Sequence, residues 1–203
     1  MVPAVLDRIF AAVLLAVHGA PAPDTSVLAR AAPPALSYPA EVSGGPFSPG
    51  LTAQAYLSVN LKNGAVVFAK QPHQQRPIAS LTKIMTGVLA AEHGDLEQRI
   101  RVPLAATRVE PTRDDLRAGR RYARGLLLDS ALMISANDAA YTLGYDLGGG
   151  NIKRFYGLMN DAAADLGMAD THYASANGLD DSANRSSAND QAIMAWYALG
   201  NPT

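Results

Sequence analysis

Apolar and polar residues alternate along the segment that follows Leu51. Every second position from 53 to 59 is alanine, leucine or valine, which is the spacing of a strand with one buried face. Asn63-Gly64 comes next and favours a tight turn, because both residues tolerate positive φ. A second apolar run covers residues 66–69. The pattern therefore predicts a β-hairpin at the start of a folded domain.

A helical repeat replaces the alternation after Pro77. Apolar residues then recur three and four positions apart, as a single stripe on one helix face: Leu81, Ile84, Met85, Val88 and Leu89. Further helices are expected over residues 122–134, over residues 138–148, from Asn151 as N-cap to Gly167, and after Ser187. Two strands followed mainly by helices predict an α+β domain whose sheet is begun but not completed.

Ser80 and Lys83 lie three positions apart near the start of the first predicted helix, so they project from nearly the same face. The helix N-terminus favours a developing alkoxide. Burial among apolar neighbours lowers the pKa of a lysine, which can then accept the hydroxyl proton of a serine nucleophile. A chance pair on a helix surface is the alternative, because serine and lysine are both common.

Ser135 and Asn137 lie between two apolar helical stretches. Asn137 or Asp138 is expected to cap the following helix, a role that needs no catalysis. The apolar residues before them nevertheless predict that this loop is held inside the domain, where a hydroxyl and a carboxamide need partners. Ser80 and Lys83 would be suitable partners.

The N-terminus is typical of a secretory signal peptide over residues 1–31. Arg8 precedes a short apolar run, and the small-x-small site Ala29-Arg30-Ala31 follows. The run is shorter than the roughly 20 apolar residues that span a bilayer, and a buried N-terminal helix is the alternative. The Pro-, Ala- and Gly-rich residues 32–50 are expected to be a linker, with the domain over 51–203.

Composition excludes several function classes. The formal net charge of -1 gives no reason to expect nucleic acid or an acidic lipid surface as a partner. The absence of cysteine excludes disulfides and thiolate zinc sites. The four histidines lack metal-ligand spacing, so no metal is expected.

Taken together, these segments resemble the serine D-alanyl-D-alanine carboxypeptidases, which are low-molecular-weight penicillin-binding proteins. Their relatives carry the signature Ser-x-x-Lys, Ser-Asp-Asn and Lys-Thr-Gly. Residues 78–92 are similar to the whole helix of the first motif, and residues 126–144 resemble the second, with Ser-x-Asn in place of Ser-Asp-Asn. Residues 155–181 resemble the segment that follows, up to Gly178-Leu179. The resemblance implies a β-lactamase/transpeptidase-like fold, a helical cluster against an antiparallel sheet, with the later sheet strands missing.

The resemblance also implies roles and a reaction. Ser80 would be the acylated nucleophile, Lys83 its general base, and Ser135 a proton relay toward the leaving amine. Asn137 would hold the substrate amide and help to position Lys83, and the backbone N–H of Ser80 would form half of an oxyanion hole. The reaction would remove the terminal D-alanine of a peptidoglycan stem peptide through an acyl-enzyme, without metal or organic cofactor. β-Lactam antibiotics would acylate the same serine.

The third motif is absent from the sequence. Neither Lys-Thr-Gly nor Lys-Ser-Gly occurs, and the nearest string, Lys62-Asn63-Gly64, precedes Ser80. The chain is therefore either a fragment, which the intact first two motifs favour, or a degenerate relative, and its activity alone is in doubt. A non-catalytic penicillin- or wall-binding relative is one alternative. A class A-like β-lactamase is another, although those enzymes use a glutamate to activate the deacylating water and no glutamate follows Glu110.

The implied compartment is outside the cytoplasmic membrane, in the periplasm or the cell wall, with a role in peptidoglycan biosynthesis and cell shape. The expected partners are the peptidoglycan stem peptide and β-lactams, with peripheral membrane association as a further expectation. The sequence leaves open whether carboxypeptidase or endopeptidase action dominates.

Overall fold

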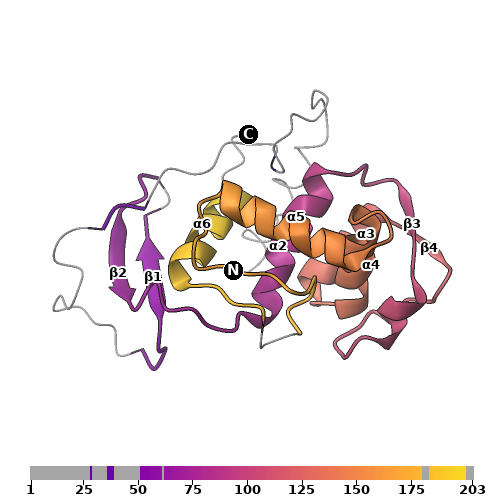
Figure 1. Ribbon diagram of the computed structural model, residues 1–203, viewed down its shortest axis with the longest axis horizontal. Helices are drawn as coiled ribbons and strands as arrows, with labels where there is room; N and C mark the ends of the chain where they lie inside the picture. The colour runs from indigo at the N-terminus through magenta and orange to yellow at the C-terminus, as the bar shows by residue number, and fades with distance from the viewer. Residues whose placement is uncertain (1–27, 29–35, 39–50, 61, 180–182, 200–203) are drawn as a thin grey trace.

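Helices form the middle of the molecule, and a two-stranded antiparallel sheet lies at each end (Figure 1). This computed structural model describes residues 28, 36–38, 51–60, 62–179 and 183–199. The elements in chain order are β1 (Tyr56–Val59), β2 (Val66–Lys70), the 3₁₀ turn η1 (Ala79–Leu81), α2 (Thr82–Glu92), β3 (Arg99–Arg101), the 3₁₀ turn η2 (Leu104–Arg108), β4 (Arg121–Ala123), α3 (Arg124–Met133), α4 (Asn137–Leu147), α5 (Ile152–Asp165) and α6 (Ala188–Leu199).

The opening hairpin is confirmed. β1 pairs antiparallel with β2, with Tyr56 opposite Lys70 and a register shift between Ser58 and Val59. Gly64 adopts a φ of 71°, which glycine reaches without steric cost. The connection is longer than the tight turn that the sequence predicts, because the paired strands stop at Val59 and resume at Val66.

The predicted helices are confirmed, and so is Asn151 as the N-cap of α5. Asn151 accepts hydrogen bonds from the backbone N–H groups of Lys153 and Arg154 at the start of α5. Ser187 Oγ accepts one from the N–H of Asp190, at 3.2 Å, at the start of α6. These side chains bind backbone donors that a first helical turn leaves without intrahelical partners.

Two local predictions are wrong. The helix expected from residue 122 begins at Arg124, because Tyr122 and Ala123 belong to β4, which pairs with β3. Strands of three residues are too short for their alternation to stand out in the sequence. The N-cap of α4 is Ala136, with no side-chain cap bond, so neither Asn137 nor Asp138 caps the helix as expected.

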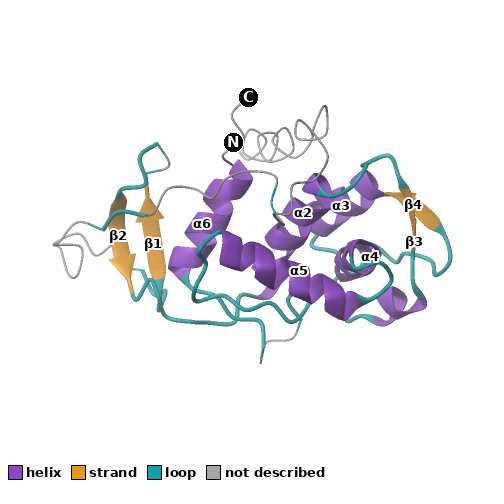
Figure 2. Cartoon of the chain, turned by 45° about the horizontal axis from the view of Figure 1, so that its top comes forward, coloured by secondary structure: helices purple, strands orange, loops and turns teal. Residues whose placement is uncertain are grey.

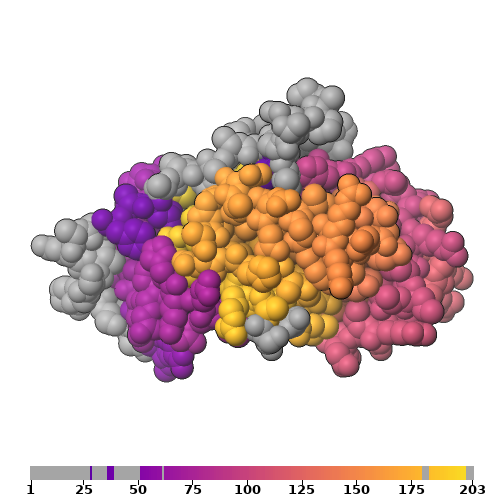
Figure 3. Space-filling model, in the orientation of Figure 1, coloured from indigo at the N-terminus to yellow at the C-terminus, as the bar shows by residue number. Residues whose placement is uncertain are grey.

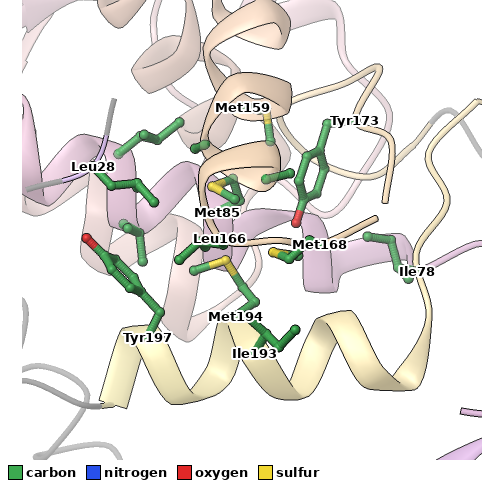
Figure 4. Close-up of a cluster of buried hydrophobic side chains, with 14 of the residues drawn as sticks. Leu28, Ile78, Met85, Met159, Leu166, Met168, Tyr173, Ile193, Met194 and Tyr197 are labelled. Carbon is green, nitrogen blue, oxygen red and sulfur yellow. The ribbon is translucent and has the colours of Figure 1, made fainter. Parts of the chain in front are cut away.

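Helix α2 lies between two apolar cores. Met85, Val88 and Leu89 pack into one core with α5 and α6, and that cluster is drawn in Figure 4. Ala90 and Ala91, on the other side of the helix, pack into a second core with residues of β3, η2, α3 and α4. A helix buried on both sides holds its first turn firmly, and this turn carries Lys83.

The described helices cluster between the two small sheets when the molecule is turned (Figure 2). In the space-filling view, the atoms of α5 and of the residues that follow it form the centre of the face shown (Figure 3). Within the described residues, no helix is long and apolar enough to cross a membrane.

The N-terminal predictions fall mostly outside the described residues. Only Leu28 of the predicted signal peptide and residues 36–38 of the predicted linker are described. Leu28 is buried in the core with α5 and α6. Ser37 forms a parallel bridge with Ala65, and the Tyr38 hydroxyl donates a hydrogen bond to Asn189, at 2.7 Å. These residues therefore contact the folded part of the chain.

Candidate active site

Three segments that are distant in sequence bring polar groups together at the start of α2. Ser80 belongs to η1, and Lys83 to the first turn of α2. Ser135 lies in the junction between α3 and α4, and Asn177 in the connection between α5 and α6. The sequence predicts Ser80 and Lys83 on one helix, whereas the structure places Ser80 in the 3₁₀ turn that leads directly into α2.

Ser80, Lys83 and Ser135 form a closed triangle of side-chain contacts. Lys83 Nζ lies 3.0 Å from Ser80 Oγ and 3.1 Å from Ser135 Oγ. Ser135 Oγ donates a hydrogen bond to Ser80 Oγ, at 2.9 Å. Each of these distances is short enough for direct proton transfer between the two atoms.

The surroundings of Lys83 favour its neutral form. Only 3% of the residue is exposed, and burial lowers the pKa of its amine to about 8. Desolvation disfavours an ammonium ion, and no described carboxylate forms an ion pair with it. The direction of this pKa shift agrees with the one that the sequence predicts for Lys83. Ser80, by contrast, is exposed and accessible to a ligand.

The backbone on both sides of the triangle is strained. Ala79 has a φ of 45° and Ser135 a φ of 59°, in the left-handed region that non-glycine residues seldom occupy. Such conformations cost about 1–3 kcal/mol each and persist only where surrounding contacts impose them. The strain falls on the residue before the exposed hydroxyl and on the residue that carries the second hydroxyl.

Sequence reasoning missed Asn177, which completes the environment of the amine. Its backbone carbonyl accepts a hydrogen bond from Lys83 Nζ, at 2.9 Å. Thr86 Oγ1 donates to the neighbouring carbonyl of Ala176, at 2.8 Å, so α2 holds this loop at two successive carbonyls. The Asn-Gly pair at 177–178 was available as a turn signal, but nothing in the sequence indicates that the loop reaches α2.

Gly178 explains how the loop comes so close. Its φ is 87°, and a Cβ atom at this position would lie 1.9 Å from the carbonyl oxygen of Ala79. Only a residue without a side chain allows the two backbones to approach in this way. The contact fixes the Asn177 carbonyl next to Lys83.

Asn137 lies beside the triangle but binds other groups. Its side-chain nitrogen donates to the carbonyl of Glu110, at 2.9 Å, and its backbone N–H donates to the carbonyl of Thr112, at 2.8 Å. The expectation that Asn137 helps to position Lys83 has no counterpart among its hydrogen bonds in the structure. The Asn177 carbonyl contacts the amine directly instead.

Two cavities meet at Ser80 and Ser135. One, of about 240 Å³, is lined by Ala79, Ser80, Pro111, Thr112, Ser135, Asn137, Asn177, Gly178 and Leu179. The other, of about 380 Å³, is lined by Ile78, Ser80, Leu81, Lys83, Ile84, Ala131, Leu132 and Ser135. Asn137 and the candidate nucleophile Ser80 therefore line the same cavity.

The arrangement suits acyl transfer, because an accessible hydroxyl lies against a desolvated amine and a second hydroxyl bridges to both. Among the described residues, no group of three histidine, aspartate or glutamate side chains is placed to hold a metal ion.

Similarity to known proteins identifies the family of this chain. The family model described as D-alanyl-D-alanine carboxypeptidase matches residues 44–201. The chain belongs to the D-alanyl-D-alanine carboxypeptidase family. It is 32% identical over 152 residues to the D-alanyl-D-alanine carboxypeptidase DacB2 of Mycobacterium tuberculosis, an alignment that covers 74% of this chain and 52% of DacB2.

Solved structures of carboxypeptidases share the fold. A D-alanyl-D-alanine carboxypeptidase from Mycobacterium tuberculosis is similar with a TM-score of 0.70 and 32% identity, over 74% of this chain and 57% of that one. Penicillin binding protein 5 from Haemophilus influenzae is similar with a TM-score of 0.72 and 27% identity, over 77% of this chain and 47% of that one. The predicted transpeptidase-like α+β fold is therefore confirmed. The chain spans about half the length of the curated carboxypeptidases that it matches.

Proposed function

We propose that this chain carries the acylating site of a serine D-alanyl-D-alanine carboxypeptidase. Ser80 Oγ attacks the carbonyl carbon of the penultimate D-alanine in a stem peptide, and its proton passes to Lys83 Nζ. Ser135 relays a proton to the nitrogen of the departing D-alanine as the peptide bond breaks. Water then cleaves the ester on Ser80, which releases the shortened peptide and regenerates the hydroxyl.

The observation that carries this proposal is the triangle of Ser80, Lys83 and Ser135. All three pairs of polar atoms lie within 3.1 Å, so one proton can move from nucleophile to base and onward to the leaving group without a long transfer. With a pKa of about 8, about one Lys83 amine in ten is neutral at pH 7, and a general base is most effective when its pKa is near the working pH.

Two further groups are assigned to ligand binding. Asn137 lines the same cavity as Ser80, and its carboxamide is proposed to hold the substrate amide. The backbone N–H of Ser80 is proposed to be one of the two donors of an oxyanion hole. Removing one such donor costs about 10²–10³ in rate.

The substrate and the compartment follow from the same proposal. The family is named for D-alanyl-D-alanine cleavage, and one structural neighbour is named a penicillin binding protein. We propose that this chain likewise binds peptidoglycan stem peptides as substrates and β-lactams as acylating ligands. A substrate in the cell wall fits export through residues 1–31 to the periplasm or wall, with a role in cell-wall synthesis and shape. Peripheral membrane association stays a prediction.

The second candidate function is a penicillin-binding relative that is acylated but does not turn over. One structural neighbour is named a penicillin binding protein, and the contacts of Ser80 with Lys83 and Ser135 account for acylation without requiring turnover. A class A-like β-lactamase is disfavoured, since no glutamate follows Glu110 to activate the deacylating water.

Intact-protein mass after incubation with a fluorescent penicillin tests the proposal. A stable mass increase that peptide mapping assigns to Ser80, and that is absent from Ser80→Ala, supports acylation at the proposed nucleophile. Release of D-alanine from a stem-peptide analogue then separates a carboxypeptidase from a relative that only binds. Rapid release of hydrolysed drug would indicate a β-lactamase, and an unlabelled wild-type chain would contradict the proposal.

A further inference from the structure

We propose that Asp138 is a positioning residue that fixes one wall of the cavity at Ser80. It does so by clamping residues 110–116 to the start of α4, with Asn137 as the other half of the clamp. The inference rests on the proposed function, because the wall matters only if ligands occupy that cavity. Asp138 itself contacts neither the substrate site nor the reacting atoms.

The Asp138 carboxylate is completely buried and faces two backbone donors of the wall. Its Oδ1 accepts a hydrogen bond from the N–H of Asp114, and its Oδ2 one from the N–H of Leu116, both at 3.0 Å. Oδ1 also accepts from the N–H of Ala139, at 3.0 Å. Hydrogen bonds to an ionised group are stronger than those between neutral groups. This carboxylate therefore binds the backbone N–H groups of Asp114 and Leu116, two residues apart in the same segment, with strong hydrogen bonds.

Asn137 binds the same segment at Glu110 and Thr112, which precede the residues bound by Asp138. Its backbone N–H donates to the Thr112 carbonyl, and its side-chain nitrogen to the Glu110 carbonyl. Two adjacent residues of α4 therefore bind four successive alternate positions of one chain segment, at 110, 112, 114 and 116. Such a pattern resembles strand pairing, with helix side chains supplying three of the four partners and the Asn137 backbone N–H the fourth.

Among the described residues, the segment has few other polar restraints: the Arg113 side chain donates to the carbonyls of Thr107 and Val109, at 3.3 and 3.4 Å, and lies 3.7 Å from the Asp115 carboxylate. The segment runs between the end of η2 at Arg108 and the start of β4 at Arg121, and residues 110–115 are exposed. Leu116 is its buried apolar anchor, at 7% exposure in the core with α3 and α4. The clamp therefore supplies the main polar restraint on the segment.

The segment matters because it forms part of the cavity. Pro111 and Thr112 line the same space as Ser80, Ser135 and Asn137. A shift of this wall changes how a ligand sits against the Ser80 hydroxyl, whereas the Lys83 contacts with Ser80, Ser135 and Asn177 stay unchanged. Loss of Asp138 should weaken ligand positioning without altering the base.

Asp190 provides a matched control. Like Asp138, it is a buried carboxylate in the first turn of a helix, at 1% exposure. Its Oδ2 accepts from the backbone N–H of Asp170, at 2.8 Å, and from Thr171 Oγ1, at 2.7 Å. None of these residues lines either cavity at Ser80, so its loss costs buried hydrogen bonds at a site that does not touch the wall.

The experiment compares wild type, Asp138→Asn and Asp190→Asn by amide hydrogen exchange and by acylation with a fluorescent penicillin. Asp138→Asn turns one acceptor oxygen into a donor that faces an N–H group, so amide exchange over residues 110–116 should become about tenfold faster. The penicillin concentration for half-maximal acylation rate should rise by about tenfold, with the midpoint of the pH profile unchanged. Asp190→Asn should accelerate exchange at the backbone N–H of Asp170, which Asp190 binds, and leave acylation as in wild type.

A loop-side variant covers the case in which Asp138→Asn does not fold. Asp114→Pro removes one N–H donor from the clamp without disturbing the buried carboxylate, and it should raise the same half-maximal concentration. Equal loss of acylation in Asp190→Asn, a displaced pH midpoint, or unchanged exchange over residues 110–116 would overturn the clamp. An unlabelled wild-type chain would defeat the proposed function instead, and the exchange comparison would still decide whether Asp138 holds the wall.

Discussion

The carbonyl oxygen of Asn177 accepts a hydrogen bond from Lys83 Nζ, at 2.9 Å, although the two residues are 94 positions apart. The bond explains how a nearly buried amine keeps a fixed direction beside the Ser80 hydroxyl. A carbonyl oxygen binds the amine whether or not it is protonated, provided that one N–H points toward it. The lone pair of the neutral amine is then free to accept the proton of Ser80.

Lys83→Arg tests whether the residue acts as a base rather than as a positive charge. Arginine stays protonated at any accessible pH, so it cannot accept the hydroxyl proton. Acylation of Ser80 by a fluorescent penicillin should slow by about 10²–10⁴, although the charge is retained. Rates within threefold of wild type would show that the amine is not the base.

The stability of the wild-type chain should depend on pH through Lys83. The amine loses its proton near pH 8 in the folded state but near 10.5 when unfolded, so the unfolded chain binds more protons between these values. Stability contributed by this group therefore rises with pH across that window, by about 2 kcal/mol from pH 7.5 to 9.5.

Lys83→Met removes this titration and serves as the comparison. Urea unfolding of both proteins at the two pH values isolates the contribution of Lys83, because all other groups are shared. The free energy of unfolding should rise more steeply with pH in wild type than in the variant. Parallel pH dependence of the two proteins would mean that the lysine pKa is not lowered in the folded chain.

Gly178→Ala should destabilise the fold and disturb the site together. The new methyl group would lie 1.9 Å from the Ala79 carbonyl oxygen on a backbone with a φ of 87°. Overpacking and left-handed strain together should lower the free energy of unfolding by about 2–4 kcal/mol, as measured by urea denaturation.

Gly157→Ala is the matched control for that substitution. Gly157 lies within α5, and a Cβ atom there would meet nothing within 4 Å. Alanine at a helix position of this kind should stabilise the protein by about 0.5–1 kcal/mol. Similar effects of the two substitutions would contradict the close approach of residue 178 to Ala79.

Much of this site was accessible from the sequence, and the remainder depends on long-range contacts. Ser80 and Lys83 were found because a helix fixes the relation between residues three positions apart. Ser135 and Asn137 were found because polar residues interrupt an apolar pattern. The role of the Asn177 carbonyl could not be predicted, because every residue has a backbone carbonyl and the contact joins distant segments.

The same distinction applies to the fold. The hairpin of β1 and β2 and the stripe of α2 extend over enough residues for a period to emerge. The strands β3 and β4 have only three residues each, which is too few for a period to emerge. The sequence predicts Asp138 as a helix cap because aspartate is favoured at helix N-termini. In the structure its carboxylate instead accepts hydrogen bonds from the backbone N–H groups of Asp114 and Leu116, which are distant in sequence.

Processing of the N-terminus tests the predicted export signal. N-terminal sequencing of protein recovered from outside the cytoplasm should begin at Ala32, after the small-x-small site at residues 29–31. A mature chain that still contains Leu28 would contradict this cleavage site, and would agree with the burial of Leu28 in the core with α5 and α6.

The pH dependence of Ser80 acylation by penicillin tests most directly whether a neutral Lys83 amine accepts the Ser80 proton. With a lysine pKa of about 8, the acylation rate constant should rise about tenfold per pH unit below that value and level off above it. A rate that is flat from pH 6 to 9, or one that falls as pH rises through 8, would contradict the account.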